Sequence, residues 1–206
     1  MKRKIILILF VLIINVLWVN GITITNKFVN HHNIVIKTGT KTNPSSKPTI
    51  MDDIDVVLNS DLNYDGESSD IIGKKIDNFL KDDMAGYGSL ISKYAIANET
   101  NPYLIASMII VETNCDLKCS VLVKKCNNVY EAHSNSDDTS CFGGIYQKFN
   151  SIDDSIKAFI KYSKTNFYDN DLTTPSSISN VLKKDARWVF IVNQYIDKIK
   201  NSDIES

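Results

Sequence analysis

The sequence NPYLIASMIIVET, at residues 101–113, predicts the central helix of a folded domain. Asn101 is a favourable N-cap residue, and Pro102 suits the first helical turn. A nearly unbroken apolar run follows, which predicts a helix buried on most of its surface. The run leads into Glu112, a charged residue that stability alone would not select at this position.

The place of Glu112 on this helix makes it a candidate catalytic acid. Its face also carries Leu104, Ile105, Met108 and Ile109, at helical spacing. The charged form of a carboxyl group is disfavoured in such an apolar stripe and near a helix C-terminus. A protonated carboxyl group is what glycoside cleavage needs, because the leaving oxygen must receive a proton. The alternative interpretation is a frayed helix end with Glu112 pointing into solvent.

Helical spacing of apolar residues continues on both sides of this segment. Ile71–Leu80 and the residues from Leu90 onward predict two helices before it. Ser151, Thr174 with Pro175, and Asp185 are placed to begin three helices after it.

The helical pattern fails between Asn127 and Phe149. Val129-Tyr130 and Ile145-Tyr146 flank a polar, turn-rich stretch, which is typical of a β-hairpin. We therefore predict an α+β, mainly α domain over residues 71–201, with a small β-hairpin lobe.

Several segments of this domain occur in an order that resembles a known family. They are Asn101–Ala106, Val111–Thr113, Ser120–Val123, Cys126–Tyr130, Ile145–Ser151 and Trp188–Tyr195. Over about Leu90 to Ile199 the chain is similar to the bacterial glucosaminidase-type peptidoglycan hydrolases of the lysozyme-like superfamily. The resemblance implies a lysozyme-like fold and cleavage of the β-1,4 glycan strand of peptidoglycan, with Glu112 as the general acid.

The resemblance leaves the second catalytic group and the reaction type open. Relatives often have a carboxylate in the β-lobe, and the candidates here are Glu131, Asp137 and Asp138. The lytic transglycosylases of the superfamily use a single Glu instead, so the resemblance predicts either hydrolysis or transglycosylation. We further expect Tyr130 and Tyr146 to stack on sugar rings.

Amide side chains at the start of the β-lobe are candidates for other roles. Asn128 could hydrogen-bond N-acetyl groups of the sugar, whereas we expect Asn127 to cap the preceding helix.

The chain also departs from the family pattern. Asn114 follows Glu112-Thr113 where close relatives often carry Gly. The Tyr-Ala pair that often precedes the last helix is not evident, and Leu182 and Lys183 stand nearby. A non-catalytic wall-binding protein with the same fold is therefore the alternative function.

The four cysteines, Cys115, Cys119, Cys126 and Cys141, indicate two disulfides in an exported chain. Cys119 and Cys126 are seven residues apart on one expected helix, about 10 Å by helix rise, which disfavours pairing them. We favour Cys115–Cys119 with Cys126–Cys141. The alternative, a zinc site of four thiolates, lacks the usual close cysteine spacing.

The N-terminal residues predict export. A basic start at residues 2–4 precedes an apolar run from Ile5 to Val19. This pattern is typical of a signal peptide, or of a membrane anchor if it stays uncleaved. We therefore assign 1–21 to a signal or anchor and 22–70 to a flexible spacer, with the domain secreted or membrane-anchored outside the cytoplasmic membrane, at the cell wall.

Composition limits the partners of the protein. Its 206 residues suit one domain with appendages, and 23 basic against 24 acidic residues argue against nucleic-acid binding through bulk charge. The expected partners are peptidoglycan glycan strands and the bacterial envelope. We predict no cofactor and no metal site, since His31-His32 lacks further ligands at suitable spacing.

Overall fold

The computed structural model describes residues 61–134 and 140–204 of the chain. The chain divides into two compact units, Met1–His32 and Asn33–Ser206, and every described residue belongs to the second. The predicted signal or anchor at 1–21 and the predicted spacer up to residue 60 lie outside the described residues. Within those residues, no helix is both long and apolar enough to cross a membrane.

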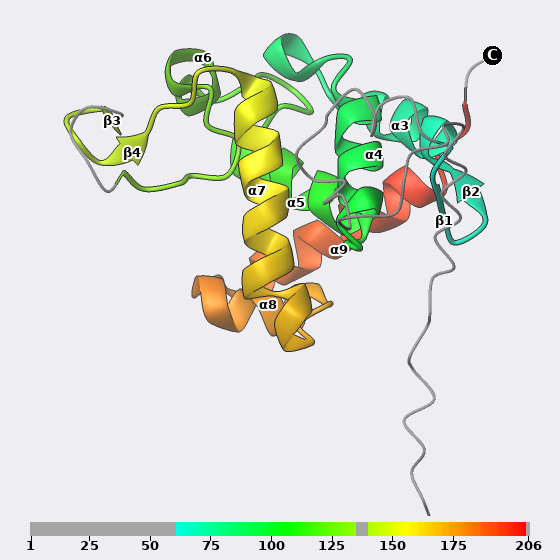
Figure 1. The fold of residues 1–206 in the computed structure, drawn as a ribbon. Helices are drawn as coiled ribbons and strands as arrows, with labels where there is room; N and C mark the ends of the chain where they lie inside the picture. The colour runs from blue at the N-terminus through cyan, green and yellow to red at the C-terminus, as the bar shows by residue number, and fades with distance from the viewer. Residues whose placement is uncertain (1–60, 135–139, 205–206) are drawn as a thin grey trace, which may run out of the picture. The chain divides into compact units, whose positions relative to one another are not determined.

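The described residues form a mainly helical α+β structure, as the sequence predicted (Figure 1). Strand β1 (Asn63–Tyr64) pairs antiparallel with β2 (Glu67–Ser68), and β3 (Ser140–Cys141) pairs antiparallel with β4 (Tyr146–Gln147). The α-helices are α3 (Ser69–Asp77), α4 (Gly88–Ala97), α5 (Pro102–Thr113), α6 (Val121–Cys126), α7 (Ile152–Asn166), α8 (Pro175–Leu182) and α9 (Ala186–Lys200). Two short 3-10 helices are η2 (Asp82–Met84) and η3 (Tyr168–Asn170).

Polar side chains begin four helices where the sequence predicted. The Asn101 side chain accepts hydrogen bonds from two backbone N–H groups of the first turn of α5, at 3.0 and 3.2 Å. Ser151, Thr174 and Asp185 accept similar bonds at the starts of α7, α8 and α9. These bonds satisfy donors that a first helical turn leaves unpaired. Local sequence therefore fixes where these helices begin.

Helix α5 is the buried centre of the domain. Every residue in it is buried except Val111 and Glu112, which are partly exposed. It packs against α9 and α4, which lie on either side of it (Figure 1). Removal of its apolar side chains from water is a main source of stability. The core thus determines where the carboxyl group of Glu112 lies.

The folded part begins earlier than the sequence predicted. We expected a spacer up to residue 70, but residues 63–68 form a hairpin and Leu62 is only 1% exposed, within the core. Asp65 and Gly66 make the turn with positive φ angles of 52° and 84°. An Asp-Gly pair favours such tight hairpins. Two-residue strands are too short to show an alternating apolar pattern, which is why the sequence did not reveal them.

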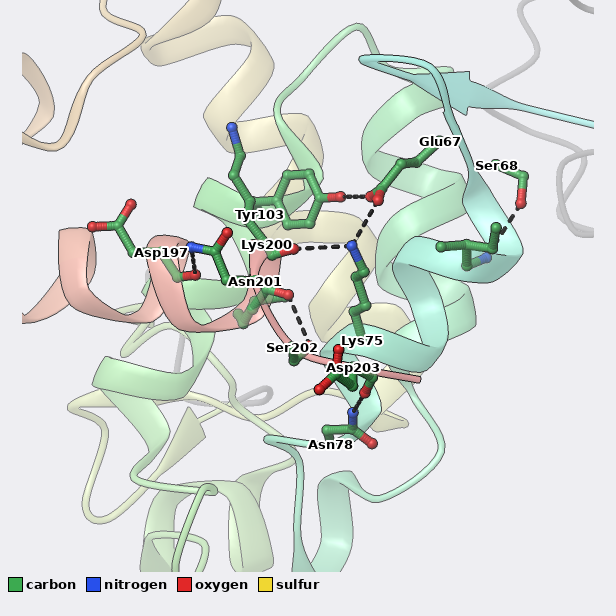
Figure 2. A network of polar contacts seen from close by, with 12 residues as sticks. Glu67, Ser68, Lys75, Asn78, Tyr103, Asp197, Lys200, Asn201, Ser202 and Asp203 are labelled. Atoms are coloured by element: carbon green, nitrogen blue, oxygen red, sulfur yellow. Dashed lines mark hydrogen bonds and ion pairs between the residues drawn. The ribbon is translucent and has the colours of Figure 1, made fainter. Parts of the chain in front are cut away.

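A polar network fastens this hairpin to the helices (Figure 2). The Lys75 ammonium, on α3, donates to Glu67 at 2.6 Å and to the carbonyl of Lys200, at the end of α9, at 2.9 Å. The Tyr103 hydroxyl, on α5, donates to the other oxygen of Glu67. One carboxylate thereby joins the hairpin, α3 and α5, and Lys75 extends the connection to α9.

The β-lobe is a hairpin with an irregular approach. The sequence predicted a strand at Val129-Tyr130, but the structure has only a single bridge, between His133 and Tyr146, before β3. Asn128 explains the difference. Its amide donates to the carbonyls of Ala132 and Gln147, both at 2.9 Å, and so holds the loop in a tight bend.

The cysteines form the two disulfides that the sequence favoured, Cys115–Cys119 and Cys126–Cys141. The first closes the loop after α5, and the second joins the end of α6 to β3. Oxidised cysteines offer no thiolate, so the four-cysteine zinc site is not formed in this structure.

Candidate active site

A pocket of about 420 Å³ opens at the C-terminal end of α5. The β-lobe, α7 and the connection between α8 and α9 supply its other walls. Its lining residues are Met108, Glu112, Tyr130, Glu131, Ala132, His133, Gln147, Phe159, Tyr162, Leu182, Lys184 and Trp188. The pocket therefore contains Glu112 and Glu131, two of the carboxyl groups predicted to be catalytic.

Glu112 points into this pocket rather than into bulk solvent, and its side chain is 10% exposed. Its surroundings are more polar than the apolar stripe suggested. The Lys184 ammonium lies 2.8 Å from one carboxylate oxygen, and the Trp188 indole N–H donates to the other at 2.7 Å. Both oxygens of Glu112 thus have a partner in the protein.

The turn between α8 and α9 places both of these donors. Lys183 ends α8 in the left-handed conformation, with φ of 54°, and the chain reverses there. Asp185 then caps α9 by accepting the backbone N–H of Trp188 at 2.9 Å. Lys184 lies in the turn itself and Trp188 lies in the first turn of α9, so one short segment brings both side chains to the pocket.

Glu131, on the β-lobe, lies beside Glu112 in the pocket, within hydrogen-bond reach of its carboxyl group. Its carboxylate is 3.6 Å from the Lys184 ammonium, and its side chain is 47% exposed. Partial burial and then the negative charge of Glu112 raise the pKa of Glu131, against the opposing charge of Lys184. These surroundings favour Glu131 as a group that can carry a proton.

Lys184 is held as an ammonium ion by its two neighbours. Burial opposes the charged form, but the hydrogen bond and charge of Glu112, together with the charge of Glu131, outweigh burial and raise the pKa of Lys184. Because one cation faces two acids, the cluster keeps an excess negative charge until it binds a proton.

Aromatic side chains form one wall of the pocket. Tyr130 stacks on Phe159 with ring centroids 4.9 Å apart, and Tyr162 lies 6.2 Å from Tyr130. Burial raises the pKa of Tyr130 to about 12, so its hydroxyl stays neutral and can donate a hydrogen bond. Such a flat wall suits the apolar face of a sugar ring.

Other residues that the sequence suggested for substrate contact lie elsewhere. Asn128 is 1% exposed, and its amide is engaged with the backbone of the β-lobe, so its role is structural. Tyr146 does not line the pocket but packs beside His133 and Phe142. Asp137 and Asp138 fall outside the described residues. Asn127 ends α6 with φ of 52°, the capping role that we expected.

The loop behind Glu112 is held firmly. Besides the Cys115–Cys119 disulfide, the Lys81 backbone N–H donates to the Cys115 carbonyl at 2.7 Å. The Tyr195 hydroxyl, on α9, donates to Asp116. These ties limit the movement of the helix end that carries Glu112.

Among the described residues, one group has ligand atoms close enough for a metal ion: Asp82, Asp83 and Cys119. The Lys124 ammonium already pairs with Asp82 at 2.5 Å, and the Cys119 sulfur is in a disulfide. The group is therefore better described as a surface ion pair than as a metal centre.

Sequence reasoning missed the contacts of Lys184 and Trp188. The sequence places Trp188 in one of the segments that resemble the family, but nothing in it indicates that Trp188 or Lys184 contacts Glu112. The available signal was the Lys183-Lys184 pair directly before a helix cap. A basic residue at that turn lies close to the helix that packs against α9, which is α5.

The geometry of this pocket suits proton transfer to a bound ligand. Two acids, one cation and an aromatic wall converge on a space large enough for part of a sugar chain. Neither a scan against protein-family models nor a search of curated proteins returns a match to this chain.

Proposed function

We propose that the protein is an exported enzyme with a lysozyme-like fold that cleaves the β-1,4 glycan strand of bacterial peptidoglycan. The observation that supports this most is the convergence of Glu112 and Glu131 in one pocket, at the end of a buried helix. The order of sequence motifs favours an endo-β-N-acetylglucosaminidase.

In this proposal Glu112 delivers a proton to the oxygen of the glycosidic bond as that bond breaks. The departing sugar leaves with a new hydroxyl group, and positive charge develops at the anomeric carbon. Water attacks this carbon and loses a proton to Glu131, the second carboxyl group of the pocket. The aromatic wall of Tyr130 and Tyr162 would hold the sugar ring beside the two acids.

An exported location agrees with the covalent chemistry of the domain. Two disulfides persist best in an oxidising compartment. The signal-like segment at 1–21, followed by a spacer, would place the domain beside the wall, either released or anchored to the membrane.

A turbidity assay on bacterial walls tests the proposal. The full chain should clear the suspension, and Glu112→Gln should slow clearing by about 100-fold or more, because general acid catalysis contributes about that much. Glu99→Gln is the matched control, since Glu99 is an exposed partner of Lys164 and does not line the pocket. Equal clearing by wild type and Glu112→Gln would exclude Glu112 as the acid.

The products distinguish two reaction types. Hydrolysis leaves reducing ends, whereas a lytic transglycosylase leaves anhydro-sugar ends, because the sugar's own hydroxyl displaces the bond. The presence of a second carboxyl group, Glu131, beside Glu112 favours hydrolysis, since a single acid is enough for the transglycosylase reaction.

The second candidate is a wall-binding protein without turnover. The pairing of both Glu112 oxygens, with Lys184 and Trp188, favours it, because two hydrogen-bond donors stabilise the carboxylate and leave neither oxygen free to carry the proton that an acid must donate. Wild-type protein that sediments with walls but never clears them, at any pH, would support this function instead.

A further inference from the structure

The two acids of the pocket share one cation. The Lys184 ammonium is 2.8 Å from Glu112 and 3.6 Å from Glu131, so a small displacement would exchange its closer partner. Its side chain is 30% exposed, and among the residues that the structure describes it is the only Lys or Arg lining this pocket. The Lys184 ammonium therefore lies within reach of both acids.

The other titratable groups facing this cluster come from two of the surrounding elements. The β-lobe contributes Tyr130 and His133, and α7 contributes Tyr162. Helix α5 contributes Glu112 itself, and α9 contributes Trp188, which donates a hydrogen bond but does not titrate. Taken by themselves, the two carboxylates and the ammonium carry one net negative charge, and one proton neutralises these three groups.

We propose that Lys184 is a positioning residue that decides which of Glu112 and Glu131 holds this proton. In the empty pocket the ammonium pairs with Glu112, and the proton resides on Glu131. When a ligand draws Lys184 toward Glu131, the O–H bond of Glu131 breaks and an O–H bond forms on Glu112. The ammonium keeps all its protons, and the total charge is unchanged. This proposal rests on the proposed function, because it supplies the proton that Glu112 delivers.

The electrostatics of the pocket are consistent with this exchange. Burial and the charge of Glu112 raise the pKa of Glu131, and hydrogen bonding between the two carboxyl groups adds to the rise, while Lys184 lowers it. When the ammonium moves from Glu112 to Glu131, it therefore favours transfer of the proton from Glu131 to Glu112. No second proton donor is needed.

The pH dependence of glycan cleavage by the full chain tests the role of Lys184. Activity requires one proton on the acid pair, so it is lost as pH rises through the apparent pKa of the pair. Lys184→Met removes the charge that lowers this pKa, and the alkaline limb should move up by about 1 pH unit or more. Lys184→Arg keeps the charge, and its alkaline limb should stay at the wild-type position.

A Lys184→Met limb that stays in place, or moves to lower pH, would overturn the proposal. A purely structural role would lower activity at every pH without moving the limb, and is thereby distinguished. If Lys184→Met does not fold, Lys184→Gln replaces it with the same expectation.

Carboxyl ¹³C NMR of the full chain gives a readout that does not depend on activity. The Glu131 signal should titrate about 1 pH unit higher in Lys184→Met than in wild type. An unchanged Glu131 titration overturns the proposal even if the protein cleaves glycan. A shifted titration in a protein that never cleaves glycan supports the electrostatic role and contradicts the proposed function alone.

Discussion

The indole of Trp188 is the neutral donor to Glu112, and this single contact can be tested apart from catalysis. Trp188→Phe retains an aromatic ring but removes the N–H group that donates at 2.7 Å. A hydrogen bond to a charged group contributes about 1.5–3 kcal/mol, so the free energy of unfolding should fall by about that amount. Urea unfolding followed by circular dichroism measures it. A loss below about 0.5 kcal/mol would mean that water replaces the indole without cost.

The sequence predicts contacts between side chains of one helix better than contacts between residues far apart in the chain. Glu112 was identified from its own helix, because its apolar neighbours lie three to eight residues away. Its ion pair with Lys184 joins residues 72 positions apart, and nothing in a single sequence encodes which distant side chain arrives there. Asn114 ends α5 in the left-handed conformation, which both Asn and Gly tolerate, so the turn after this helix does not require a glycine.

At the scale of elements, the β-lobe depends on its link to α6. The Cys126–Cys141 disulfide closes 15 residues of chain, and Cys115–Cys119 closes only 4. Loop-closure entropy predicts that the double variant C126A/C141A loses about 3 kcal/mol of unfolding free energy and C115A/C119A about 2 kcal/mol. Chemical denaturation of the two variants side by side gives both values.

The stricter test is which of the two double variants loses more unfolding free energy. If C115A/C119A is the less stable variant, closure entropy does not govern these cross-links. The short loop beside Glu112 would then stabilise the native state directly, through its contacts with Lys81 and Tyr195.

Helices were more predictable than strands for a physical reason. The starts of α5, α7, α8 and α9 are fixed by side chains two or three residues from the backbone groups that they satisfy. The strands contain two residues each, and their pairing depends on turns and on Asn128, whose amide bridges positions 4 and 19 residues away. Alternation of apolar residues cannot appear over so short a length.

At the scale of the whole molecule, the Glu67 network joins the first hairpin to α3 and α5, and Lys75 carries it on to α9 (Figure 2). Burial opposes the charged form of Glu67, but hydrogen bonds from Lys75 and Tyr103 outweigh it and lower the pKa of Glu67. The resulting stability is present above the unfolded-state pKa of about 4.3 and is lost as pH falls through the lower folded-state pKa.

Thermal unfolding of wild type and Glu67→Gln across pH tests this dependence. The difference in melting temperature should be largest at neutral pH and should shrink steadily below about pH 4.3. Glu99→Gln, on an exposed glutamate, controls for the general effect of removing one negative charge. A Glu67→Gln deficit that is constant from pH 7 to pH 3 would show that packing, rather than charge, is what Glu67 supplies.

The decisive step of the proposed function is the transfer of a proton from Glu112 to the oxygen atom that joins two sugars. Mass spectrometry of fragments released from purified, peptide-free glycan strands addresses it most directly. Wild-type protein should release fragments with new reducing ends, and an equally folded Glu112→Gln variant should release about 10²- to 10⁴-fold fewer. Equal release by both proteins, or no release by wild type over a full pH series, would contradict it.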